Sequence, residues 1–444
     1  MCIRPLLLAT AAWGLMLATS ASADDWPQWM GPHRDDVYRE DGIVDRIPAE
    51  GLPIKWRVPV ASGYSGPAVA NGRVFLTDYV IESGKSTNSP GGRDKLTGIE
   101  RVLCFAADTG EELWKFERPR GYNISYPNGP RATPTVDEDR VYVLGAEGDL
   151  TCLRVETGEL VWEKQLAEEF KAETPIWGHS AHPLVHGELI YCLAGGPNSV
   201  AVALDKMTGQ VRWHALSASE IGYCPPTIYT LGAREQLLIW HADSLNSLDP
   251  LTGKLIWTYP LQPRYGMAIA APQISGNRLY ASGIGETAVM LELKADGTPG
   301  EALWTGRPKL GVYSGSATAL FDGDKLVGAD CGTGAFIAVN ADDGERLWET
   351  FDLTTGGDRR ASHGTAFTVK HRDKFILFTE TGDLVFAKFS AEGFEELGRM
   401  HVLEPTGEGM GRPVVWSHPA LANRCLFVRN DKELVCVNLA ADQQ

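Results

Sequence analysis

Short apolar and β-branched runs, separated by Gly-containing turns, repeat along almost the whole chain. Residues 131–164 divide into ATPTV, RVYVLG, DLTCLRV and ELVWEK, with E-D, E-G and T-G turns between them. Runs of this length and composition predict four short antiparallel strands. The same division fits seven further stretches, at residues 65–78, 181–195, 224–240, 270–283, 315–330, 363–379 and 417–430. The pattern therefore predicts eight similar β units.

A tryptophan marks the tail of most units. The tail tryptophans are Trp56, Trp114, Trp162, Trp213, Trp257, Trp304 and Trp348. They are 44 to 58 residues apart, a period typical of propellers and solenoids. Four antiparallel strands per unit favour the propeller, with each tryptophan wedged between neighbouring blades as a structural residue.

The first tail and the last unit complement each other. LPIKWRVPV (52–60) is a tail with no unit before it, and the unit at 416–439 has three strands and no tail. Adding the N-terminal segment as the outer strand of the last blade would close the ring and remove an open sheet edge. We therefore expect an all-β, eight-bladed propeller at residues 52–440, preceded by an N-terminal extension at 24–51.

The N-terminus predicts export. Residues 1–23 carry Arg4, the apolar run LLLATAAWGLMLA and then Ala21-Ser22-Ala23, which is the pattern of a cleaved signal peptide. No later apolar run approaches the about 20 residues of a membrane span. We expect a periplasmic or extracellular protein without a membrane span. The net charge of −16 argues against nucleic-acid binding, which needs a basic face, and we expect a monomer.

Seven cysteines remain after residue 23, an odd number that leaves at least one unpaired. Most lie in apolar strand-like runs, where a cysteine behaves as a small buried hydrophobe. Whether any of them form disulfides stays open.

The tails carry a family resemblance. The pattern D-x-x-T-G-x-x-x-W is complete in DKMTGQVRW (205–213) and DPLTGKLIW (249–257). It resembles the docking motif of pyrroloquinoline quinone (PQQ) propeller repeats. Two families of different class share this repeat: the quinoprotein alcohol dehydrogenases, which hold PQQ and Ca²⁺ in the channel, and the non-catalytic outer-membrane assembly lipoprotein of the BamB type.

The sequence departs from both families. Unlike the dehydrogenases it has no adjacent Cys-Cys pair, no C-x-x-C-H haem motif and no evident Glu, Asn and Asp set for the metal. Unlike the assembly lipoprotein it has no lipobox. We expect a non-catalytic binding or scaffold protein of the cell envelope, without a cofactor. The alternative is an oxidoreductase of alcohols or sugars that holds PQQ and calcium.

The long connections gather on one face of the ring. The segments 79–100, 115–129, 163–178, 349–361 and 398–415 all fall on the side of the B–C and D–A connections, whereas the A–B and C–D turns are short. The residues that open each innermost strand surround the channel mouth on the same side: Tyr64, Arg131, His179, His182, Tyr223, Met267, Tyr313, His363, Trp416 and His418. Aromatic, imidazole and guanidinium groups around a concave mouth suit a small-molecule or peptide site. The alternative is that they only plug the channel.

Other motifs have simpler interpretations. His179 and His182 are three apart, and on a strand such residues point to opposite faces, so no metal site is predicted. DCGTG (330–334) predicts a tight hairpin, and EKQLAEEFKAE (163–173) predicts a short surface helix. Trp177 and Tyr122 are the exposed loop anchors that a scaffold would need.

Overall fold

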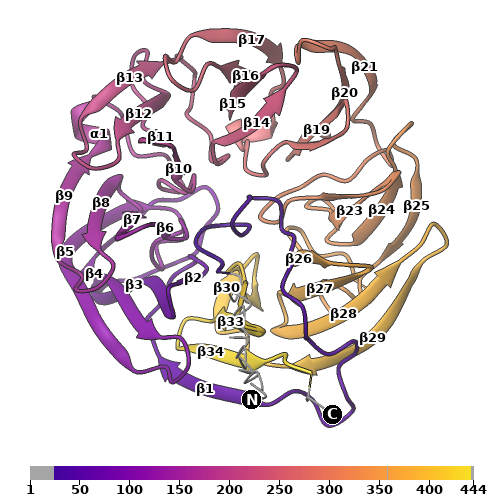
Figure 1. The fold of residues 1–444 in the computed structure, drawn as a ribbon, viewed down its shortest axis with the longest axis horizontal. Coiled ribbons are helices and arrows are strands. Elements are labelled where there is room, and N and C mark those ends of the chain that lie inside the picture. Colours follow the sequence, from indigo (N-terminus) through magenta and orange to yellow (C-terminus); the bar gives the residue numbers. More distant parts are fainter. Residues whose placement is uncertain (1–24, 358, 442–444) are drawn as a thin grey trace, which may run out of the picture.

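The computed structural model describes residues 25–357 and 359–441, and its strands form eight four-stranded antiparallel sheets around a central axis (Figure 1). The predicted eight-bladed propeller is confirmed. The predicted signal peptide at 1–23 lies outside the described residues. Among the described residues, no helix is both long and apolar enough to span a bilayer.

Each blade runs from an inner strand A to an outer strand D. Blade 1 is β2 (Ala68–Ala70), β3 (Arg73–Gly84), β4 (Asp94–Ala106) and β5 (Glu112–Ile124), and blade 2 is β6 (Thr135–Asp137), β7 (Arg140–Leu144), β8 (Asp149–Arg154) and β9 (Leu160–Gln165). Blade 3 is β10 (Leu184–His186), β11 (Leu189–Leu193), β12 (Ala201–Asp205) and β13 (Val211–Ala215), and blade 4 is β14 (Thr227–Leu231), β15 (Arg234–Trp240), β16 (Ser244–Leu248) and β17 (Leu255–Pro260).

The second half of the ring follows the same order. Blade 5 is β18 (Gln273–Ser275), β19 (Arg278–Gly283), β20 (Thr287–Leu293) and β21 (Pro299–Thr305), and blade 6 is β22 (Leu320–Asp322), β23 (Lys325–Ala329), β24 (Phe336–Asn340) and β25 (Arg346–Thr350). Blade 7 is β26 (Ala366–His371), β27 (Lys374–Thr379), β28 (Asp383–Phe389) and β29 (Phe394–His401), and a hairpin follows it, β30 (Gly407–Gly409) and β31 (Arg412–Val414).

Blade 8 joins the two ends of the chain. It contains β32 (Ala420–Ala422), β33 (Cys425–Arg429) and β34 (Glu433–Asn438), and its outer strand is β1 (Ile54–Pro59). β1 pairs with β34 in antiparallel register, with Trp56 opposite Cys436. The predicted closure of the ring by the N-terminal strand is confirmed.

The tail tryptophans lie between blades. The indole of Trp162 in blade 2 donates from Nε1 to the carbonyl oxygen of Lys206 in blade 3, at 3.0 Å. Five others make the same bond to the next blade, at Trp56, Trp114, Trp213, Trp304 and Trp348. In the D-x-x-T-G turns, the Asp205 carboxylate accepts bonds from the backbone and hydroxyl of Thr208, which fixes the turn that covers Trp162.

Blade 1 differs from the sequence-based prediction. The segments 79–100 and 115–129 were expected as loops, but most of their residues extend β3, β4 and β5 beyond the length of other blades. Polar residues within these strands are paired: Asp78 bonds Arg101 and Glu100 bonds Arg118, each at 2.6 Å. The expected helix at 163–173 is a single turn, α1 (Leu166–Glu169). DCGTG forms the predicted tight turn between β23 and β24.

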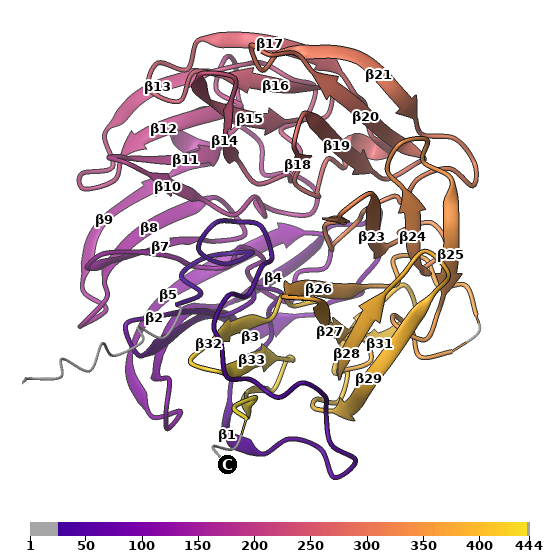
Figure 2. The same cartoon turned by 45° about the vertical axis from the view of Figure 1, so that its right-hand side comes forward.

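The N-terminal extension crosses one face of the ring (Figures 1 and 2). Trp26 bridges Val69 at the A–B end of blade 1, and Val37 bridges Lys370 at the equivalent end of blade 7. Trp26 and Trp29 are both buried. Residues 25–38, which we call the plug, therefore cover the channel at the end where the A–B turns lie.

The seven cysteines of the described residues are free and buried.

Candidate functional site

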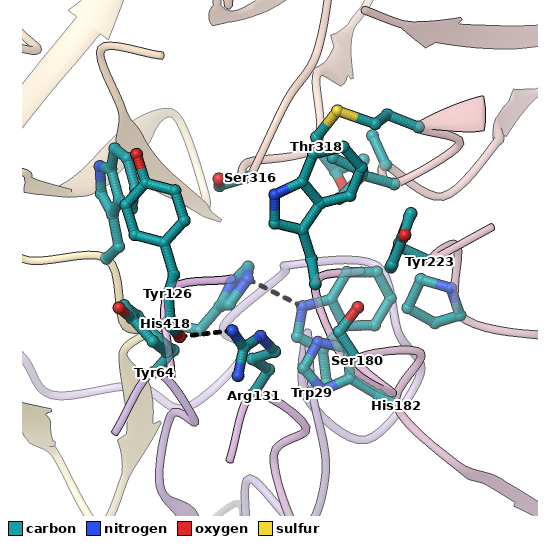
Figure 3. Close-up of a pocket in the computed structure, with 16 residues that line it drawn as sticks. Trp29, Tyr64, Tyr126, Arg131, Ser180, His182, Tyr223, Ser316, Thr318 and His418 are labelled. Carbon is teal, nitrogen blue, oxygen red and sulfur yellow. Dashed lines mark hydrogen bonds between the residues drawn. The ribbon is translucent and has the colours of Figure 1, made fainter. Parts of the chain in front are cut away.

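A blind chamber opens at the end of the channel opposite to the plug. It has a volume of about 180 Å³. Its walls come mainly from the D–A connections, just before the inner strands of several blades (Figure 3). The lining residues are Trp29, Tyr64, Tyr126, Arg131, Trp177, Ser180, His182, Tyr223, Pro225, Met267, Ile269, Ala270, Ser316, Thr318, Trp416 and His418.

Trp29 of the plug forms the floor of the chamber. Its ring stacks on His182 with centroids 4.8 Å apart and planes 7° apart, and its Nε1 donates to Nε2 of His418 at 3.2 Å. Arg34 anchors the plug by donating to the carbonyl oxygens of His182, Pro183 and Pro226. The chamber is therefore closed at this end by the chain itself.

The two floor histidines are neutral and their acceptor nitrogens are occupied. Nδ1 of His182 accepts the backbone N–H of Thr133 at 2.8 Å, and Nε2 of His418 accepts the Trp29 indole. Burial lowers the pKa of His418 to about 3 and that of His182 well below its usual value. A neutral imidazole whose lone pair already accepts a hydrogen bond is neither a free general base nor a free metal ligand.

Arg131 brings a positive charge into the chamber. Its guanidinium donates to the carbonyl oxygens of Gly129, Ser125 and Tyr126 at 2.5–2.8 Å and lies 5.1 Å from the ring centroid of Tyr64. Burial lowers the pKa of Arg131. None of the described residues around the chamber is an aspartate or glutamate.

A wider vestibule of about 520 Å³ continues the chamber towards solvent. Chamber and vestibule share Tyr126, Trp177, Met267, Ile269, Ser316 and Trp416. The vestibule is further lined by Pro90, Gly91, Ile176, Tyr265, Ile284, His363 and Met410, so its walls are largely apolar.

Several vestibule residues have strained backbones. Tyr126, Tyr265, His363 and Met410 have φ values between 50° and 61°. This region is unfavourable for bulky residues, and such strain gathers at ligand sites.

Seven of the sequence-predicted mouth residues line the chamber: Tyr64, Arg131, His182, Tyr223, Met267, Trp416 and His418. Met267 and Trp416 line both chamber and vestibule. His363 lines the vestibule, with its Nδ1 3.4 Å from the thiol sulfur of Cys331. Burial is the main cause of its lowered pKa.

Two predicted residues line neither space. His179 is buried against the B–C turn of blade 2, where a Cβ on Gly148 would lie 2.9 Å from its Nε2. The hydroxyl of Tyr313 donates to the carbonyl oxygen of Arg307 at 2.6 Å, and its ring belongs to the apolar cluster around Trp304.

The prediction of Tyr122 as an exposed anchor is wrong. Tyr122 is 2% exposed, stacks on Tyr79 and donates to Glu100 at 2.5 Å. Trp177 is half-buried and lines the site. Trp29, Tyr126 and Met410 were missed, because they lie in the plug, the β5–β6 connection and the β30–β31 turn, where no strand periodicity places a residue at the axis.

The chamber does not fit a Ca²⁺ ion with PQQ. Calcium takes six to eight oxygen ligands, usually including carboxylates, and none of the described lining residues carries a carboxylate. Carboxylates behind the wall are already bonded: Glu220 accepts from Tyr223, Glu380 pairs with Arg412, and Asp431 accepts from the backbone N–H of Gly63. Among the described residues, no group of three or more His, Cys, Asp or Glu side chains is placed to hold a metal.

Known proteins resemble this chain in sequence and fold. A family model described as "Outer membrane protein assembly factor BamB" matches residues 98–350. The assembly factor BamB of Shewanella oneidensis is 23% identical over 331 residues, which are 67% of this chain and 82% of that protein.

Solved structures share the fold. BamB from Moraxella catarrhalis superposes with a TM-score of 0.58 at 16% identity, covering 88% of this chain and 99% of that one. The quinohemoprotein alcohol dehydrogenase from Comamonas testosteroni reaches a TM-score of 0.64 at 12% identity, covering 95% of this chain and 81% of that one. At these identities both likenesses show the fold alone.

Fold and repeats define an eight-bladed propeller of the PQQ-repeat class, as the D-x-x-T-G motif predicted. Because the family model spans more than half of the sequence, the chain belongs to the BamB family.

Proposed function

We propose that this chain is a non-catalytic propeller of the cell envelope that binds a partner at the vestibule face. The proposal includes removal of residues 1–23 on export and action as a monomer with one propeller unit. Relatives in its family are named as assembly factors of outer membrane proteins, and we propose the same general role here.

One observation carries the proposal. The described residues around the chamber include aromatic rings, hydroxyls and one guanidinium, but no carboxylate. The two floor imidazoles have their lone pairs occupied. General base catalysis needs a group that can accept a proton from the substrate. The described residues of this wall include neither a carboxylate nor an imidazole with a free lone pair.

The alternative is a PQQ- and calcium-dependent oxidoreductase. The flat indole of Trp29 at the floor favours it, since a quinone would need an aromatic surface to lie on. The donor set does not favour it, because none of the described lining residues carries a carboxylate that could bind Ca²⁺.

A quinone titration tests the two functions against each other. The chain from Asp24 onward is titrated with PQQ, with and without Ca²⁺, and followed by tryptophan fluorescence, for which Trp29, Trp177 and Trp416 are reporters in the site. Dye reduction with simple alcohols and sugars is measured in parallel. We expect no Ca²⁺-dependent binding and no turnover. Calcium-dependent binding with turnover would replace the scaffold proposal by the oxidoreductase.

Site-directed crosslinking tests the partner face. A photoreactive residue at Trp177, in the vestibule, is expected to capture an envelope protein in cells. The control position is Leu251, which is 76% exposed in the C–D turn of blade 4, on the opposite face, and we expect no capture there. Equal capture at both positions would contradict the assignment of the vestibule face.

A further inference from the structure

Among the described residues, the chamber presents a cation without a carboxylate in its walls. Within the same part of the chain, the hydrogen bonds that Arg131 donates go to backbone carbonyls of residues 125–129. Every lining residue other than Arg131 is apolar, aromatic, hydroxyl-bearing or a neutral imidazole. A desolvated guanidinium binds an anion strongly, because its hydrogen bonds to a carboxylate are charge-assisted.

A structural arginine in the same protein provides a comparison. Arg429 is fully buried and donates to the carbonyl oxygens of Ala61, Thr77 and Asn430. It shares the carbonyl bonding of Arg131. However, Arg131 borders a cavity. An arginine that only fastens a loop does not need a cavity beside it, so the cavity at Arg131 indicates a role beyond holding the loop.

The shape of the site limits which part of a ligand can reach Arg131. Trp29 closes the far end of the chamber, so a ligand enters through the vestibule. The chamber holds about 180 Å³ and the apolar vestibule about 520 Å³. A small charged end followed by a larger apolar body matches this order.

We propose that the chamber binds the carboxylate of an apolar ligand, with Arg131 as its partner and with Tyr126, Trp177 and Trp416 around the apolar body. This inference rests on the proposed function, since it describes what a binding propeller would hold in its site. The carboxylate can belong to the C-terminus of a peptide or to a free monocarboxylic acid.

A groove beside the vestibule offers different contacts to a peptide and to a free monocarboxylic acid. Ile176 belongs both to the vestibule and to a neighbouring groove of about 440 Å³. That groove is more polar than the vestibule, and its polar residues are Arg93, Glu173, Thr174, Ser219 and Glu220. A peptide backbone leaving the vestibule would find hydrogen-bond partners there, whereas an alkyl chain would not.

Matched acids and amides test the proposal. The probes are octanoate and octanamide, and an acetylated hexapeptide of apolar residues ending in leucine, as free acid and as C-terminal amide. Binding is measured by calorimetry and tryptophan fluorescence. We expect each acid to bind at least about tenfold more tightly than its amide, because a hydrogen bond to a charged group is worth more than a neutral one. The acid that binds more tightly identifies the source of the carboxylate: octanoate indicates a free monocarboxylic acid, and the hexapeptide indicates the C-terminus of a peptide.

Three variants test whether the preference for acid over amide arises at Arg131 in the chamber. Arg131→Gln is expected to remove the preference for acid over amide, while Arg57→Gln keeps it. Arg57 is the control, because it also donates to a backbone carbonyl, that of Val402, but lines neither the chamber, the vestibule nor the groove. Ser316→Tyr leaves Arg131 intact and narrows the passage between chamber and vestibule, so it is expected to weaken binding of both acids.

The outcomes separate this inference from the proposed function. Equal binding of acid and amide, or a preference that survives in a folded Arg131→Gln protein, would overturn the inference and leave the scaffold role standing. If Arg131→Gln does not fold, loss of acid binding in Ser316→Tyr supports the site and unchanged binding overturns it. Calcium-dependent quinone turnover would overturn the proposed function, whatever the acids do.

Discussion

At the scale of single residues, the C–D turn glycines are constrained by their own backbone and by the tryptophan of the previous blade. Gly209 has φ +70°, and a Cβ there would lie 2.9 Å from Trp162. Gly187, in the A–B turn of the same blade, has φ +58° with no atom within 4 Å of such a Cβ. Both positions disfavour alanine for backbone reasons, but only Gly209 adds a steric clash.

We therefore expect Gly209→Ala to destabilise the protein more than Gly187→Ala. The backbone effect is about 1 kcal/mol at both sites, and overpacking against Trp162 adds about 1–3 kcal/mol at Gly209. Urea unfolding followed by circular dichroism measures both variants. Equal losses would show that the indole moves aside without cost.

His418 gives the stability a predictable pH dependence. Its pKa is lowered to about 3 by burial, against about 6.5 in an unfolded chain. Below pH 6.5 the unfolded state therefore binds the proton first, so the stability that His418 contributes is complete above pH 6.5 and is lost as the pH falls towards 3.

The pH dependence of the wild type is compared with that of His418→Gln, whose side-chain oxygen can still accept the hydrogen bond from the indole N–H of Trp29. From pH 7.5 to 4.5, we expect the unfolding free energy of the wild type to fall relative to the variant by about 3 kcal/mol, at about 1.4 kcal/mol per pH unit below 6.5. Titrating groups that do not interact with His418 cancel in this difference, including Asp149, whose pKa burial raises to about 6. A constant difference would mean that His418 is not buried neutral.

At the scale of elements, the sequence predicts a strand well where its alternation comes from burial. ATPTV, RVYVLG, DLTCLRV and ELVWEK correspond closely to β6, β7, β8 and β9. The extended parts of β3, β4 and β5 were missed, because they contain charged residues such as the buried Glu100, which pairs with the half-buried Arg118. A hydropathy pattern predicts a loop at such residues, because the partner that allows a charged residue to be buried lies elsewhere in the chain.

The same limit applies to the site. The start of an inner strand places a residue near the channel mouth, as for Arg131 and His418, but it does not fix the direction of the side chain. Tyr313 occupies an equivalent position and its hydroxyl bonds Arg307 instead. Trp29 reaches the axis only through the tertiary contacts of the plug, for which no local pattern exists.

At the scale of the whole molecule, two N-terminal elements act on the ring differently. The plug covers the channel through buried side chains such as Trp26, Trp29 and Tyr38, but it belongs to no blade. β1 completes blade 8 by pairing with β34, and Trp56 bonds the carbonyl oxygen of Ala107 in blade 1. Loss of the plug removes packing, whereas loss of β1 removes closure.

Two truncations separate these contributions. A chain starting at residue 42 lacks the plug and keeps β1, and we expect a folded monomer with a lower melting temperature. A chain starting at residue 61 also lacks β1 and exposes the edge of β34, and we expect it to associate or aggregate, because an unpaired strand edge is a template for pairing. Light scattering after size exclusion and thermal unfolding distinguish the two. A monomeric, cooperatively unfolding chain from residue 61 would contradict the role of β1, since blade 8 would then be stable with three strands and the ring would hold without its closing strand.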